Sequence, residues 1–205
     1  MRIQFQVLLD KYTVGLIIKK SLLMKSRKEK KKRVLSRVWK AYEEKLKDVP
    51  RMETRRGNLN LRFAVLSVEL YRVLLEEGLK ESEAIEEINT LMWGTYKFIG
   101  NIVWLLGGRR NKLARVQSSM SLLRRGLFPK PDFGWEEISR TDKISGFNCT
   151  KCPIGAYFLK ENLSDVCVQS ICKLDHQLSD HLGVNFERTK TIANGDETCD
   201  FRWKL

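Results

Sequence analysis

The cysteines of this chain gather in its last third, where they could supply a thiol nucleophile or ligate a metal ion. They are Cys149, Cys152, Cys167, Cys172 and Cys199. The reactive form of a cysteine is the thiolate, so its surroundings decide whether it reacts. What each thiol can do therefore depends on the elements that position it and on the charged groups that those elements bring near.

Cys199 lies on the second strand of a predicted terminal hairpin. The turn signal Asn194-Gly195 separates VNFERTKTI from ETCDFRWKL, and this dipeptide favours a two-residue hairpin loop. Because side chains alternate along a strand, Arg188 and Lys190 would lie on the same face as Cys199. Such bases lower the pKa of a nearby thiol and can bind a carboxylate. The alternative is that Cys199 is a small core residue.

Cys152 immediately precedes Pro153, and proline is favoured at the first position of a helix. Cys152 would then be the N-cap of a short helix that reaches about Leu163. Backbone N–H groups and the helix dipole stabilise a thiolate at that position. The alternative is a cysteine that merely precedes a helix.

Asp175 falls within the apolar stripe of a helix predicted over residues 165–182. Carboxylates are seldom buried without a partner, and Arg188 is the partner that we favour. Such a pair is either a structural salt bridge or part of a catalytic site. On the same helix, Cys172 and His176 would border the site.

The rest of the chain sets the fold class. Helical periodicity fills most of residues 34–126, Pro129 and Pro131 end this helical half, and ISGFNCT predicts a strand. We therefore expect an α+β fold, in which a helical N-terminal half packs on a small C-terminal region with an antiparallel sheet and two helices.

Charge is concentrated near the start of the chain. The net charge is +13, and residues 25–33 read KSRKEKKKR. We interpret residues 1–50 as a basic helical arm, whose basic run is a solvated helix face. Contact of residues 25–33 with nucleic acid or a membrane surface is the alternative, although no nucleic-acid fold signature accompanies them.

Cysteine usage and hydropathy bear on the compartment. An odd number of cysteines and a start without a small-residue cleavage site favour a reduced, cytoplasmic protein. Residues 91–108, LMWGTYKFIGNIVWLLGG, are marginal for a membrane span, and we expect a buried or interfacial helix instead. The sequence leaves a homo-oligomer open.

Three motifs, CTKCPIGAYF, CKLDHQL and RTKTIANGDETCDFRWK, resemble the L-2-amino-thiazoline-4-carboxylic acid hydrolase family in their order and spacing. The resemblance covers about residues 60–205, and we expect a hydrolase-like domain over residues 51–205. The Cys-Pro, Cys-x-x-Asp and terminal Gly-Asp-x-x-Cys-Asp-Phe motifs of that family are all present. The basic run at residues 25–33 is not part of the resemblance.

The resemblance implies hydrolytic opening of a thiazoline ring to N-carbamoyl-L-cysteine, with a small anionic substrate. That reaction needs a nucleophile, a proton for the leaving sulfur and an anchor for the carboxylate. We assign Cys199 or Cys152 as the nucleophile or thiol acid/base, Asp175 as the proton acceptor and Arg188 as the anchor. Cys172 is a further catalytic candidate, and Lys190 and His176 are further substrate-binding candidates; we expect no cofactor.

A metal site is the rival hypothesis, since two cysteine pairs at residues 149–152 and 167–172 have spacing that zinc or an iron–sulfur cluster tolerates. On a regular α-helix, however, Cys167 and Cys172 would point about 140° apart. A closed four-thiolate site would then be hard to build, and we predict no metal. A non-catalytic, cysteine-rich ligand- or metal-binding regulatory module is the alternative function.

Overall fold

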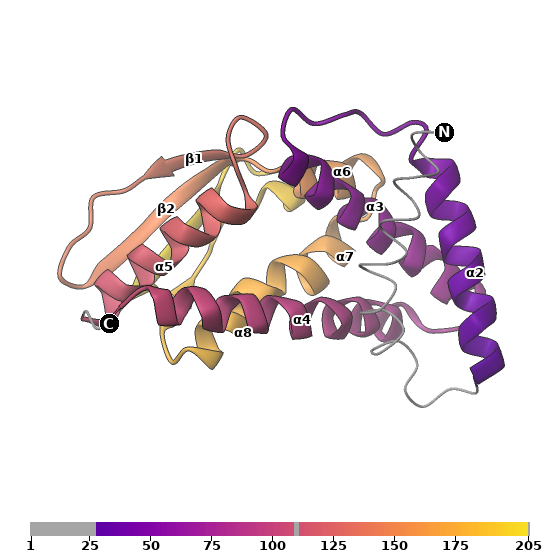
Figure 1. The fold of residues 1–205 in the computed structure, drawn as a ribbon, viewed down its shortest axis with the longest axis horizontal. Coiled ribbons are helices and arrows are strands. Elements are labelled where there is room, and N and C mark those ends of the chain that lie inside the picture. The colour runs from indigo at the N-terminus through magenta and orange to yellow at the C-terminus, as the bar shows by residue number, and fades with distance from the viewer. Residues whose placement is uncertain (1–27, 109–110, 205) are drawn as a thin grey trace.

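Helices come first along the chain and strands later, as the α+β prediction requires. The computed structural model describes residues 28–108 and 111–204. Its N-terminal helices are α2 (Lys28–Lys45), α3 (Arg55–Glu76), α4 (Glu81–Leu106) and α5 (Lys112–Leu127). The C-terminal helices are α6 (Pro153–Lys160), α7 (Ser164–Cys167) and α8 (Lys173–His181), with a π-helical segment, Val168–Cys172, joining the last two. Figure 1 shows α4 running along the molecule beside α8.

The sheet is antiparallel, and its strand order is β1-β2-β4-β3. Its strands are β1 (Gly134–Glu137), β2 (Ile144–Lys151), β3 (Asn185–Glu187) and β4 (Cys199–Lys204). In the central pair, β2 and β4, Cys149 lies opposite Cys199. Directly opposite residues of an antiparallel pair have neighbouring side chains, so the sheet itself brings these two thiols together.

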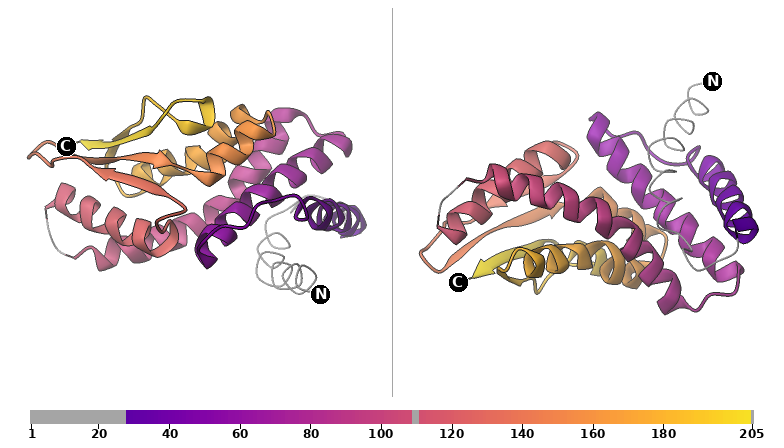
Figure 2. Two further views of the ribbon diagram at one scale, coloured as in Figure 1. Left: turned by 90° about the horizontal axis from the view of Figure 1, so that it is seen from above. Right: turned by 60° about the horizontal axis from the view of Figure 1, so that its bottom comes forward.

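Two clusters of buried side chains form the core. The first joins α2, α3, the start of α4, α6 and α7, and the second joins the end of α4, α5, α8 and the sheet. The long helix α4 contributes to both, through Ile88 and Leu91 at one end and Val103 at the other. Figure 2 shows this helix bridging the helical and the sheet-containing parts.

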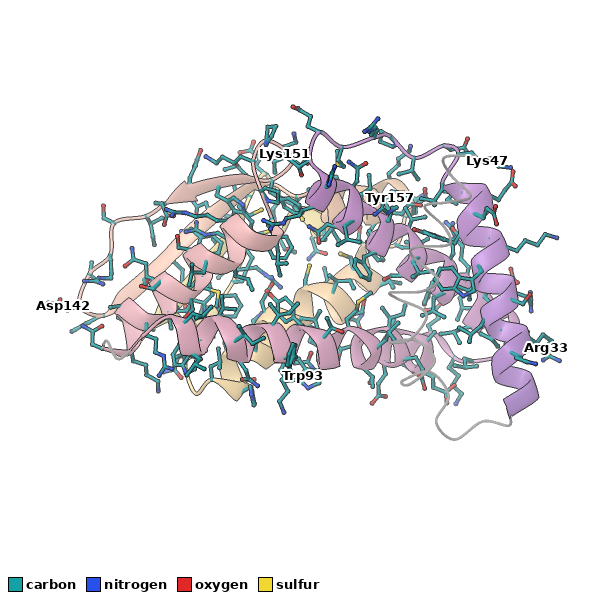
Figure 3. The ribbon with its side chains drawn as sticks, viewed as in Figure 1. Arg33, Lys47, Trp93, Asp142, Lys151 and Tyr157 are labelled. Atoms are coloured by element: carbon teal, nitrogen blue, oxygen red, sulfur yellow. The ribbon has the colours of Figure 1, made fainter. Side chains whose placement is uncertain are left out.

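Helix α2 packs on α3 as part of the first cluster. Its residues Val34, Val38 and Tyr42 are buried, and Arg33, whose side chain Figure 3 shows on α2, forms a salt bridge with Glu77. Residues 1–27, which include the first three residues of the basic run, lie outside the described residues. The proposed boundary at residue 50 stays a prediction.

The terminal hairpin differs from the prediction. Phe186 does face Trp203, in the register that a two-residue loop requires, but β3 ends at Glu187 instead of continuing to the turn. The backbone N–H groups of Thr189 and Lys190 donate to the Asp200 carboxylate, at 2.9 and 2.6 Å. Because a side chain satisfies these donors, the chain leaves the sheet.

The turn itself is also different. A 3-10 helix, Ile192–Asn194, replaces the end of the predicted strand, and Gly195 follows it with φ of 93°. This left-handed conformation favours glycine. The predicted two-residue loop at Asn194-Gly195 is therefore wrong, and the turn is a longer, ordered excursion. Strand β1 was not predicted.

None of the helices within residues 28–108 and 111–204 combines the length and the apolar character that a membrane span requires.

Candidate active site

A cavity of about 390 Å³ lies between α3, α4, the C-terminal helices and the sheet. All five cysteines of the chain line it. Asp175 and Arg188 line it as well, and most of the remaining wall is apolar. A largely apolar pocket with a few convergent polar groups is the usual form of a small-molecule site.

The π-helical segment brings Cys172 to this cavity. In a π-helix the backbone hydrogen bond joins residues five apart, so residues five apart lie nearly above one another. The Sγ atoms of Cys167 and Cys172 are accordingly 3.9 Å apart. The predicted separation of about 140° on a regular α-helix is therefore wrong.

A side chain of α4 supports the π-helical segment. The Asn89 amide donates to the Ser170 carbonyl at 2.7 Å and to the Gln177 side chain at 3.0 Å. Asn89 is buried, and a buried carbonyl without a donor would be costly. This tertiary contact thus satisfies the backbone within the irregular turn.

Cys152 is the N-cap of α6, as predicted. The Gly155 backbone N–H donates to its sulfur at 3.4 Å. Hydrogen bonding by the Cys149 thiol lowers the pKa of Cys152, although burial acts in the opposite direction, and the Gly155 N–H adds to the lowering. Pro153 is the first residue of the helix. It has no backbone N–H, so no donor is left unsatisfied at that position.

Cys199 has the more extensive set of thiolate-stabilising contacts. The Ile192 backbone N–H donates to its sulfur at 3.2 Å, and the Thr191 hydroxyl lies 3.5 Å from it. Hydrogen bonding by the Cys149 thiol, these two groups and the charge of Arg188 together lower the pKa of Cys199 to about 6, against the effect of burial. The pKa of Cys149 is raised by its hydrogen bonding with Cys152 and Cys199. Its sulfur also lies 3.4 Å from the Lys151 carbonyl oxygen, which can accept the same single thiol proton. Cys199 is therefore suited to be a thiolate at neutral pH.

The predicted ion pair between Arg188 and Asp175 is present. Arg188 Nη1 lies 2.8 Å from Asp175 Oδ2, and Arg188 Nη2 donates to the Cys172 carbonyl at 3.0 Å. The side chains are 6% and 21% exposed, respectively. The guanidinium also lies over the Phe201 ring, 5.4 Å from its centroid. Arg188 is thus held in place at the cavity wall.

Tyr96 of α4 completes this group. Its hydroxyl donates to Asp175 Oδ1 at 2.7 Å. Burial and the negative charge of Asp175 raise the pKa of Tyr96 well above its ordinary value. The phenol therefore keeps its proton at neutral pH, and both carboxylate oxygens of Asp175 are held by a donor.

The family model for L-2-amino-thiazoline-4-carboxylic acid hydrolase matches residues 60–203 of the chain. The chain belongs to this family. No curated protein and no solved structure shows a significant match to it.

The three motifs that resemble the hydrolase family meet at the cavity. Cys152 comes from the first motif, Cys172 and Asp175 from the second, and Arg188 and Cys199 from the third, and all five line the same space. The structure thus brings together five of the seven predicted site residues of this hydrolase family member.

Lys190 and His176 do not line the cavity. Lys190 is exposed, because the chain has left the sheet at that point and its predicted place beside Cys199 does not exist. The His176 ring packs against Phe186, with centroids 4.7 Å apart, and burial and the nearby Arg188 lower its pKa. The geometry gives neither residue access to a substrate in the cavity.

Two contributors of this hydrolase family site were not predicted. The sequence indicates Cys149 only as a metal-ligand candidate, although its spacing from Cys152 already places it nearby. Tyr96 was overlooked within the apolar stretch of residues 91–108. Met92, Thr95, Tyr96 and Ile99 all line the cavity, and this i, i+3, i+4, i+7 spacing is that of one helix face. Thr95 and Tyr96 are two polar side chains on this otherwise apolar helix face, and they were the signal from which this part of the site could have been predicted.

A metal site was the rival hypothesis for these cysteines. Over the described ranges, no three His, Cys, Asp or Glu side chains are arranged to hold a metal ion. Cys167 and Cys172 do meet, so their angle on a regular α-helix does not exclude a shared metal ion.

Proposed function

We propose that this protein is an enzyme that hydrolyses a cyclic amidine carboxylate of the 2-amino-thiazoline-4-carboxylate type and opens its ring between carbon and sulfur. The observation that carries the proposal is the convergence of Cys199, Asp175 and Arg188 on one cavity, from motifs that the family model spans. A thiolate, a carboxylate and a guanidinium are the groups that such a reaction needs.

Cys199 is the nucleophile in this proposal, in preference to Cys152. Its pKa of about 6 makes the thiolate the main form at neutral pH, and Arg188 supplies a positive charge nearby. The thiolate attacks the amidine carbon, the bond from that carbon to the ring sulfur breaks, and the ring sulfur leaves and takes up a proton from the Cys152 thiol. Cys152 is the acid/base partner, connected to Cys199 through hydrogen bonding by the Cys149 thiol.

Water completes the reaction. It attacks the same carbon, Asp175 accepts a proton from it, and the Cys199 sulfur leaves as the thiolate. The two protons of the water end on the amidine nitrogen and, by way of Asp175 and solvent, on Cys152. The water oxygen becomes the carbonyl oxygen of an N-carbamoyl group, so the net change is the addition of water. Tyr96 and Arg188 fix the orientation of the Asp175 carboxylate for this step.

Arg188 anchors the substrate carboxylate. Its known contacts are to Asp175 and to the Cys172 carbonyl, and a guanidinium has more N–H groups than these two contacts use. A substrate bound there would have its ring next to the cysteines.

The test is to incubate the protein with 2-amino-thiazoline-4-carboxylate and to measure the free thiol that ring opening releases. We expect Cys199→Ser and Asp175→Asn each to abolish thiol release while circular dichroism stays unchanged. Cys167→Ser, in the same cavity, is the matched control and should have a mild effect. Full turnover by both of the first two variants would remove these roles, and binding of the acid without any turnover would identify a non-catalytic binding module.

A further inference from the structure

The cavity is larger than a thiazoline carboxylate requires. Its volume is about 390 Å³, whereas a cavity of about 150 Å³ with apolar walls suffices for benzene. A single small ring with one carboxylate would therefore leave much of the space empty. An empty apolar space forfeits contacts on every side, which points to a ligand with additional bulk.

Much of the wall that would contact this bulk comes from other elements than the reactive groups. The thiols and Asp175 lie on or after β2, on the C-terminal helices and at the start of β4, and Arg188 follows β3. A large apolar part of the wall comes from α3, α4, β1 and the segment between α5 and β1, through Phe63, Met92, Ile99, Phe128 and Trp135. These side chains carry no charge and only one hydrogen-bonding group, the Trp135 indole N–H.

That N–H is already engaged. It donates to the Phe128 carbonyl at 3.0 Å, and the Trp135 ring stacks on Phe133 with an interplanar angle of 8°. Phe128 packs edge-on against Phe133, with ring centroids 5.1 Å apart. These rings form a fixed aromatic surface that offers a ligand shape and apolar contact instead of hydrogen bonds.

We propose that the natural ligand is a carboxylate with an aryl or alkyl group larger than the thiazoline ring, and that this group occupies the apolar part of the cavity. The assignment of the reacting end as a cyclic amidine rests on the proposed function. The apolar part rests on the volume and the walls alone, so the two can be tested separately.

The test uses simple alkanoates as probes of the apolar part. Isothermal titration of the full chain with the series from butyrate to decanoate should give affinities that rise by up to about fourfold for each added methylene, until the cavity is filled. An affinity that does not change along the series would overturn the proposal.

Two variants that narrow the cavity show where the probes bind. Ala64 is buried on α3 and Thr95 is half-buried on α4, and both line the cavity. We expect Ala64→Leu and Thr95→Leu to weaken decanoate binding at least about tenfold while butyrate binding stays within about twofold. Ala156→Leu, at an exposed position of α6, is the matched control and should leave the whole series unchanged.

Identical binding series in the control and in both narrowed variants would place the probes on the outer surface and overturn the proposal. Thermal unfolding shows whether each variant folds. If Ala64→Leu does not fold, the result for Thr95→Leu, at the less buried position, decides between the outcomes. Chain-length dependence without ring opening of any cyclic amidine would support the apolar ligand and contradict the proposed function. Ring opening of a cyclic amidine without chain-length dependence would support the proposed function and contradict the apolar ligand.

Discussion

At the scale of single residues, hydrogen bonding gives three of the five thiols different preferences for their protonated form. Cys199 and Cys152 accept hydrogen bonds that favour their thiolates, whereas Cys149 donates and keeps its proton. The sequence predicted Cys152 as an N-cap because Pro153 follows it. It could not predict the contacts of Cys199 with Thr191 and Ile192, because they depend on a turn that the Asn194-Gly195 signal misrepresents.

The pKa of Cys199 gives a pH prediction. Because the folded protein holds this pKa at about 6, below the ordinary value of a thiol, the thiolate is present above that pH and is lost on acidification. We expect kcat/KM for ring opening to fall about tenfold per pH unit below 6. Cys149→Ala, which removes the main donor, should move the midpoint to higher pH, whereas Cys149→Ser keeps a donor and should move it less. An unchanged midpoint in Cys149→Ala would contradict the assignment of Cys199 as the titrating nucleophile.

Tyr96 offers a second prediction at this scale. Tyr96→Phe removes the hydrogen bond to Asp175 and leaves the ring in place. A hydrogen bond to a charged group contributes about 1.5–3 kcal/mol, so we expect a loss of stability in that range by urea unfolding. We also expect a fall in kcat that exceeds the change in KM, because Tyr96 orients Asp175 without anchoring the substrate. Tyr71→Phe, at a buried tyrosine outside the cavity, is the control for kcat.

At the scale of elements, the regular pieces were predictable and the irregular ones were not. The amphipathic periodicity behind α3, α4 and α5 is strong, and β2 and β4 have alternating patterns. The π-helical segment could not be predicted from a period of 100° per residue, since a contact from Asn89, distant in sequence, supports it. Strand β1 is only four residues long and follows two prolines that signal a break.

Asn89 provides the test of that support. Asn89→Ala leaves the buried Ser170 carbonyl without its donor, and we expect a loss of about 1–3 kcal/mol in the free energy of unfolding. Thr90→Ala, at the next, exposed position of α4, is the matched control. Equal stability of the two variants would show that α4 does not hold the π-helical segment.

Substitutions of Cys152, the N-cap of α6, distinguish a structural role of this residue from a chemical one. Cys152→Ser retains a side-chain acceptor, whereas Cys152→Ala loses it at a typical cost of about 1 kcal/mol. We therefore expect Cys152→Ser to be the more stable of the two by thermal unfolding. If the thiol also takes part in proton transfer, both variants lose turnover to a similar extent. Turnover that follows stability instead would limit Cys152 to a capping role.

At the scale of the whole molecule, α2 belongs to the core although its outer surface is basic. Lys45 of α2 contacts Glu161 at 3.0 Å, and Glu161 also contacts Arg72 of α3 at 2.8 Å, so ion pairs join α2, α3 and α6. The sequence could show the helical periodicity of α2 but not that its apolar face packs on α3. Contact of residues 25–33 with nucleic acid or a membrane surface stays an untested alternative to a solvated helix face.

Removal of residues 1–50 tests whether α2 is an accessory arm. Val34, Val38 and Tyr42 would leave the core, and burial of such side chains contributes about 1.5–3 kcal/mol each. We expect the shortened chain to lose more than about 4 kcal/mol of unfolding free energy. Removal of residues 1–27 alone, which keeps all of α2, is the comparison. Equal unfolding midpoints for the two shortened chains would show that α2 is dispensable.

The π-helical turn also has a consequence for how relatives should be compared. Such a turn holds one more residue than the α-helical turn it replaces, so loss of a single codon within residues 168–171 would leave a regular α-helix whose later residues keep their orientation. Cys172 would then lie four residues after Cys167, on the same face of that helix, and Asp175 would still face the thiols. A one-residue gap at this place in an alignment would therefore not separate homologues that can assemble this constellation from those that cannot.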